Sequence, residues 1–222
     1  MKFDVHPSKQ MVELFKRKPF QGQIPERARI IFLSSDANYS PEISNHQFFK
    51  VILEYQNDGI AFWKKYGYHH PFLLPNYPFN KNQGGVPFHR NFSKVGLTSQ
   101  YAELISFLEL LDAPTIGNKS ENPKAFFELL APAHLKRIDE LITGSSNKLF
   151  FIPGGVLRDM IAIKKRGSFF QWLDYDPRSS TKYSTTINGN KIKEIYHFSS
   201  TQIHGQIPEI SKEIELWLQE EK

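Results

Sequence analysis

The chain has 222 residues, enough for one α/β domain with an ample core, and we predict a single domain over residues 1–222. It contains no cysteine, which excludes disulfides, thiol nucleophiles and cysteine-held zinc or iron–sulfur centres. Lys and Arg number 28 against 23 Asp and Glu, and the net charge of +5 mildly favours polyanionic partners. Because the sequence contains no signal peptide and no long apolar run, we expect a soluble cytoplasmic protein without membrane contacts.

The first half of the sequence predicts helices around one buried strand. Apolar residues at helical spacing indicate helices over residues 11–15, 48–55 and 62–66. The uninterrupted apolar run Ile30-Ile31-Phe32-Leu33 is typical of a strand inside a parallel sheet. Residues 67–87 carry paired histidines, prolines, glycines and aromatic residues, and a loop this long and apolar is expected to line a site.

The second half of the sequence predicts further strands separated by helices. Apolar runs indicate buried strands over residues 105–111 and 148–152, and Ile195-Tyr196-His197 indicates the last one. Asn188-Gly189 is a strong hairpin turn, and the final amphipathic helix is expected to open at Pro208. Strands that alternate with helices predict an α/β fold, a three-layer α/β/α sandwich around a short, mostly parallel sheet.

Polar residues follow the first and the last buried strands, at residues 34–39 and 197–201. Since the carboxyl ends of parallel strands meet at one edge of a sheet, we expect Asp36 and His197 to lie in one crevice. A carboxylate beside an imidazole suits hydrolysis through a cationic transition state. Two simpler roles stay open, because Asp36 also suits a helix cap and a lone histidine is often a structural hydrogen-bonding group.

These strand ends resemble motifs of the uracil-DNA glycosylase superfamily. Ser34-Ser35-Asp36-Ala37 resembles the Gly-Gln-Asp-Pro motif after the first strand, and His197-Phe198-Ser199 resembles the His-Pro-Ser motif after the last. The similarity covers roughly residues 28–205 and is nearest to the mismatch-specific uracil/thymine branch. Shorter stretches between the two motifs also agree with that branch, at residues 88–98, 110–115 and 148–160.

The resemblance implies a monofunctional DNA glycosylase that needs neither a cofactor nor a metal. Asp36 would stabilise the oxocarbenium-like sugar or orient the attacking water, and His197 would stabilise negative charge on the departing base. Glu109 stands where the superfamily reads the base edge with Asn or Asp. An ionised Glu accepts hydrogen bonds but donates none, so the resemblance does not fix which base is excised.

The resemblance also implies how DNA would be held. The partner would be single- or double-stranded DNA bound by a monomeric protein, with Tyr39 and Phe72 stacking on the flipped base. Ile203 is the candidate wedge, because Thr201 stands where the family has its wedge leucine. The expected contacts to the DNA backbone are Ser199, Ser200 and Thr201.

Three alternatives stay open. Ser34 and Ala37 replace residues that are usual in the water-activating loop, which fits a non-catalytic nucleic-acid or nucleotide-binding protein of the same fold. Asp36 could instead serve an unrelated hydrolase as its nucleophile. His69, His70 and His89 suggest a metal, but adjacent histidines point apart and no carboxylate lies at an established ligand spacing.

Overall fold

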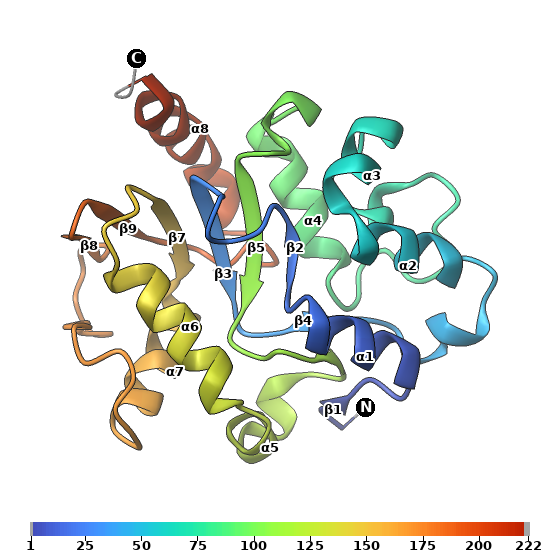
Figure 1. Ribbon diagram of the computed structural model, residues 1–222, viewed down its shortest axis with the longest axis horizontal. Helices are drawn as coiled ribbons and strands as arrows, with labels where there is room; N and C mark the ends of the chain where they lie inside the picture. Colours follow the sequence, from blue (N-terminus) through green and yellow to red (C-terminus); the bar gives the residue numbers. More distant parts are fainter. Residues whose placement is uncertain (1, 220–222) are drawn as a thin grey trace.

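The apolar runs of the sequence form the inner strands of a six-stranded sheet. In the computed structural model, which describes residues 2–219, four strands are parallel neighbours and two antiparallel strands form the edges (Figure 1). This confirms the predicted α/β fold with a mostly parallel sheet. The order across the sheet is β2 (Phe20–Gly22), β5 (Ile105–Glu109), β3 (Ile30–Ser34), β7 (Leu149–Pro153), β9 (Asn190–Ile195) and β8 (Ser184–Ile187).

Helices cover both faces of this sheet, because side chains alternate along each inner strand. Ile31 and Leu33 of β3 pack with residues of α5, α6 and α7 on one face. Ile30 and Phe32 pack with residues of α3, α4 and α8 on the other. The helices are α1 (Lys9–Arg17), α2 (Phe49–Asn57), α3 (Gly59–Tyr66), α4 (Val86–Phe92), α5 (Pro123–Glu128), α6 (Pro132–Thr143), α7 (Gly154–Lys164) and α8 (Ile203–Gln219).

Phe32 lies at the centre of the second face. Its ring stacks on Phe151 and Phe107, with centroids 5.1 and 5.7 Å away, and meets the edge of Phe92 at 4.9 Å. Burial of one such side chain stabilises a fold by about 1.5–3 kcal/mol. This aromatic cluster fixes the spacing between β3, its two neighbouring strands and α4.

A second, smaller sheet lies beyond the carboxyl ends of β3 and β5. It consists of β1 (Asp4–Val5), β6 (Pro114–Ile116) and β4 (Ala37–Asn38), in that order. β4 and β6 are parallel, with Ala37 opposite Pro114 and Asn38 opposite Thr115. This sheet was not predicted from the sequence, because strands of two or three residues carry no periodic pattern. It holds the segments that follow β3 and β5 side by side.

Several boundaries differ from the sequence expectation. The strand expected at residues 105–111 ends at Glu109. Of the strand expected at residues 195–197, only Ile195 belongs to β9, which runs from Asn190 to Ile195. Helix α8 begins at Ile203 rather than at Pro208, which lies inside the helix. The earlier start follows from Ile203 and Ile207, both buried, which extend the apolar face ahead of the proline. Within residues 2–219, no helix is long and apolar enough to cross a membrane.

Candidate functional site

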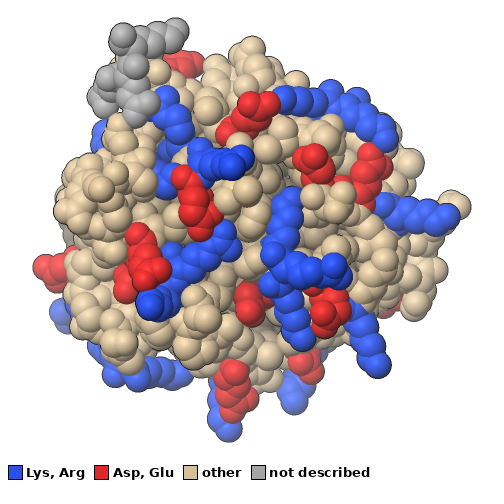
Figure 2. Space-filling model, in the orientation of Figure 1, with Lys and Arg blue, Asp and Glu red and all other residues tan. Residues whose placement is uncertain are grey.

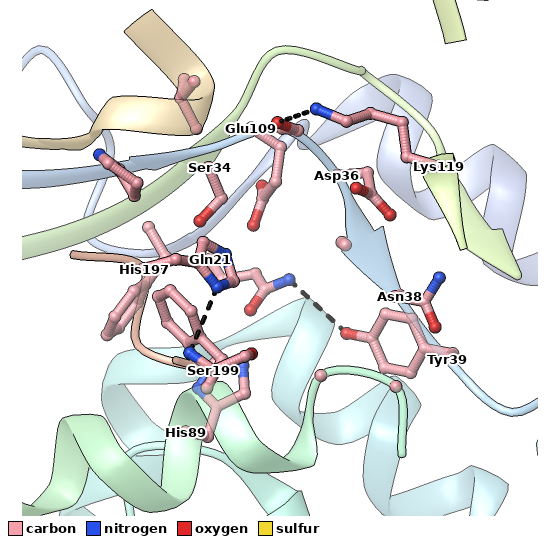
Figure 3. A pocket seen from close by; sticks show the side chains of 18 of the residues that line it. Gln21, Ser34, Asp36, Asn38, Tyr39, His89, Glu109, Lys119, His197 and Ser199 are labelled. Carbon is pink, nitrogen blue, oxygen red and sulfur yellow. Dashed lines mark hydrogen bonds between the residues drawn. The ribbon is translucent and has the colours of Figure 1, made fainter. Parts of the chain in front are cut away.

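A cavity of about 440 Å³ lies at the carboxyl edge of the parallel strands (Figure 3). The register explains its position: Ser34 at the end of β3 pairs with Glu109 at the end of β5, and Pro153 of β7 pairs with Ile195 of β9. The cavity lining brings together the three side chains on which the sequence analysis concentrated, Asp36, Glu109 and His197.

Asp36 lies in the turn between β3 and β4 and is partly buried. Thr115 of β6 donates its hydroxyl to Asp36 Oδ2 at 2.5 Å. Burial raises the pKa of Asp36, while the hydrogen bond from Thr115 and the nearby Lys119 ammonium oppose that rise. The carboxylate is therefore fixed in orientation by the small sheet while its charge is weakly solvated.

Glu109 is the last residue of β5 and points into the cavity between Ser34 and Asp36 (Figure 3). The residue is 6% exposed, and its Oε2 atom is buried without a hydrogen-bond partner among residues 2–219. Burial, together with the charge of Asp36, raises the pKa of Glu109 to about 8. Near neutral pH the group is a carboxylic acid with one O–H donor and one carbonyl acceptor. The acceptor-only behaviour of an ionised Glu therefore applies to Glu109 only above this pKa.

His197 lies just beyond β9 and lines the cavity. The backbone N–H of Ser199 donates to His197 Nδ1 at 3.1 Å, so the proton of the neutral ring resides on Nε2. Desolvation by the surrounding protein and the positive charge of Lys119 lower the pKa of His197 to about 4. At neutral pH the ring is an uncharged hydrogen-bond donor.

Lys119 is a charged member of the cavity lining that the sequence analysis missed. Its ammonium donates to Ser35 Oγ at 2.9 Å and forms a salt bridge with Asp159, while Ser35 Oγ donates to Asp159 Oδ2 at 2.8 Å. It also lies 4.7 Å from the centre of the Phe126 ring. Lys119 follows Gly117-Asn118 in a polar stretch, and nothing in that stretch marks it as a cavity residue.

The expected aromatic residues also line the cavity. Tyr39 and Phe72 are both buried, with ring centroids 5.3 Å apart in an edge-on arrangement. Gln21 of β2 joins them, because it donates to Tyr39 Oη at 3.5 Å and accepts from Tyr55 Oη at 3.0 Å. The segment over residues 67–87 contributes His70, Phe72, Gly84 and Gly85 to the lining of this cavity.

The residues expected to contact DNA differ in how exposed they are. Ser199 lines the cavity and is exposed, Thr201 is exposed nearby in the chain, and Ser200 is partly buried with its backbone N–H bonded to His197 O at 2.8 Å. Ile203 is fully buried in the core between the sheet and α8. A wedge has to reach the DNA duplex, so the proposal of Ile203 as wedge is wrong for this conformation.

Charged side chains of both signs are mixed over the surface. On the face drawn in Figure 2, Lys and Arg side chains alternate with Asp and Glu. Local ion pairs account for part of this mixture, including Lys64 with Glu103 and Lys65 with Glu54. Among the described residues, no group of three His, Cys, Asp or Glu side chains has the arrangement of a metal site.

Comparison with known proteins finds no matching family model, no similar curated protein and no similar solved structure.

Proposed function

We propose that this protein is a DNA glycosylase of the uracil-DNA glycosylase superfamily, which hydrolyses the N-glycosidic bond of a damaged or mismatched base. The observation that supports this proposal is the meeting of Asp36, Glu109 and His197, from three different strand ends, in one cavity. The cavity, at about 440 Å³, has room for a nucleobase with part of its sugar. The arrangement offers an anion, an acid and a neutral donor to one bound group.

Asp36 serves the sugar in this proposal. As the C1′–N bond lengthens, the electron pair moves onto the base and positive charge develops on the sugar. The Asp36 carboxylate stabilises that charge and accepts a proton from the water that adds to C1′. Because Thr115 already bonds Oδ2, the carboxylate is oriented before the substrate arrives.

His197 serves the departing base. Its neutral ring presents Nε2–H, since Nδ1 is occupied by the Ser199 N–H. A neutral imidazole can donate to a base anion, and its donor stays in place over the pH range in which DNA is stable. Lys119 favours this state, since its charge opposes protonation of the ring.

Glu109 serves recognition. A protonated carboxyl group pairs with a base edge that presents an acceptor beside an N–H, because it supplies one donor and one acceptor of its own. In this respect the acid resembles the Asn side chain that the superfamily commonly has at this position. Binding such a base would also give Glu109 Oε2 the partner it lacks.

The start of α8 provides the candidate contact to the DNA backbone. Ser199 and Thr201 are exposed just ahead of this helix of 17 residues, at the end where the helix dipole favours an anion. A nucleotide whose base enters the cavity would carry its phosphate near this end.

The test measures base release from oligonucleotides that contain uracil, hypoxanthine, xanthine or a thymine mismatch. In Asp36→Asn the amide cannot balance positive charge, so we expect release from the best substrate to fall about hundredfold or more with nearly unchanged oligonucleotide affinity. The matched control is Asp176→Asn, because Asp176 is exposed and does not line the cavity.

Three other outcomes would contradict the proposal. Equal activity of the parent protein and Asp36→Asn would remove Asp36 from the chemistry. Oligonucleotide binding without release of any base would favour the non-catalytic binding protein. A covalent adduct on Asp36, detected by mass spectrometry of the denatured protein, would favour the unrelated hydrolase.

A further inference from the structure

Three buried histidines, His69, His70 and His89, form a cluster under the cavity. His70 and His89 belong to the cavity lining, and their rings stack with centroids 3.6 Å apart and planes 11° apart. His69 Nε2 lies 3.1 Å from His89 Nδ1, which satisfies one nitrogen of each ring. Burial lowers the pKa of all three imidazoles, so the cluster is uncharged at neutral pH.

The protons of the His70 ring can be assigned from its contacts. The backbone N–H of Phe72 donates to His70 Nδ1 at 3.2 Å, so Nδ1 is the acceptor and Nε2 carries the proton. His70 is 0% exposed, and its Nε2 atom is buried without a hydrogen-bond partner among the described residues. A buried donor without an acceptor destabilises a fold, so such a group calls for a partner.

His6 provides an internal comparison. Like His70 it is buried. Its Nδ1 accepts a hydrogen bond at 3.1 Å from the backbone N–H of Ser8, two positions later in the sequence, as Phe72 is for His70. Its Nε2, however, donates to the carbonyl of Ser40 at 3.0 Å. Both ring nitrogens of His6, which lies outside the cavity, are therefore hydrogen-bonded. In His70, which lines the cavity, only Nδ1 has a partner among the described residues.

We propose that His70 is a specificity-determining residue, whose Nε2–H donates to an acceptor atom on the base bound in the cavity. This inference rests on the proposed function. It names the chemistry that the floor of the cavity selects: a carbonyl oxygen, such as the one at C4 of uracil or C6 of hypoxanthine, is accepted there. An exocyclic amine is rejected, because two donors would face each other with no water between them.

The test uses two pairs of bases that differ by a carbonyl and an amine on the same ring, uracil with cytosine and hypoxanthine with adenine. Single-stranded oligonucleotides of one sequence carry each base at one position, and dissociation constants are measured by fluorescence anisotropy in the Asp36→Asn background. We expect His70→Phe, which keeps an aromatic ring but no donor, to reduce the preference for the carbonyl base about tenfold. His70→Gln keeps an N–H donor and should retain part of the preference.

His6→Phe is the matched control, since it removes the same side chain at a histidine outside the cavity, and it should leave both ratios unchanged. Thermal melting checks that each variant is folded. If His70→Phe does not fold, a measurement on the parent protein, with His70 in place, still tests the proposal. In ¹⁵N-histidine NMR spectra, the His70 Nε2–H resonance should shift on adding the uracil oligonucleotide but not on adding the cytosine one.

The outcomes separate this inference from the proposed function. Unchanged ratios in a folded His70→Phe, no preference between paired bases in the parent protein, or an unmoved Nε2–H resonance would each overturn the role of His70. If the parent protein releases a base while these ratios stay unchanged, the glycosylase proposal stands without it. If the ratios depend on His70 but no base is released, His70 still reads the base and the catalytic proposal fails.

Discussion

Replacement of Glu109 by Gln should make the protein more stable at neutral pH, although it changes a residue of the candidate site. The pKa of Glu109 is raised from 4.5 to about 8 in the folded protein. In the unfolded chain the carboxyl group has its ordinary pKa and is ionised at any higher pH. In the folded protein it keeps its proton up to about pH 8. The unfolded state therefore binds fewer protons between these two values, and the stability of the folded state falls as pH rises through that window.

The size of the effect follows from the two pKa values. Each pH unit within the window lowers the free energy of unfolding by about 1.4 kcal/mol. At pH 7 this amounts to about 3 kcal/mol, a large part of the roughly 5–15 kcal/mol that stabilises a typical domain. Glu109→Gln removes this cost, because an amide has no proton to lose, while it keeps one donor and one acceptor in the cavity.

Urea denaturation at several pH values between about 5 and 8, followed by fluorescence of the three tryptophans, measures the effect. The difference in unfolding free energy between Glu109→Gln and the parent protein should grow with pH across this range. Glu54→Gln is the control, since Lys65 lowers the pKa of this partly exposed carboxylate. Glu54 is then ionised above pH 5 in both the folded and the unfolded protein, so its replacement should have an effect that does not change with pH. Parallel stability curves for Glu109→Gln and the parent protein would refute the assignment of Glu109 as a buried acid.

Two further predictions concern activity and binding. Thr115→Val removes the hydroxyl that stabilises the Asp36 anion. The acid limb of the pH profile of kcat/KM should therefore shift to higher pH by about one pH unit or more. An unshifted limb would show that Thr115 does not affect the ionisation of Asp36. Oligonucleotide affinity should fall about tenfold between about 50 and 200 mM salt, as expected for about two phosphate contacts; affinity independent of salt, measured by anisotropy, would contradict binding to the DNA backbone.

The sequence predicted the inner strands of the large sheet and the edge at which the candidate site lies, because both depend on local patterns. The run Ile30-Ile31-Phe32-Leu33 fits a strand that is buried on both faces, and parallel pairing then brings the residues after each strand to one edge. The joint position of Asp36, Glu109 and His197 follows from that rule.

The remaining parts of the site depend on contacts between distant segments. Thr115 reaches Asp36 through the small sheet, whose strands are too short to carry a pattern. Lys119 acts on Asp36 through its nearby charge. The protonation of Glu109 is set by burial, which the residue type does not reveal. The sequence does not predict that His70 stacks on His89, because this contact arises in the tertiary structure.

The parallel order of the inner strands has a consequence for how the candidate site forms during folding. β3 pairs with β5 and β7, and β9 joins only through β7, so His197 takes its place after distant parts of the chain have met. Parallel pairings between remote segments form slowly, because the loop between them must close before any contact stabilises it. In refolding from urea, recovery of base release should therefore lag behind the return of helical circular dichroism, and no partly folded intermediate should cut a glycosidic bond.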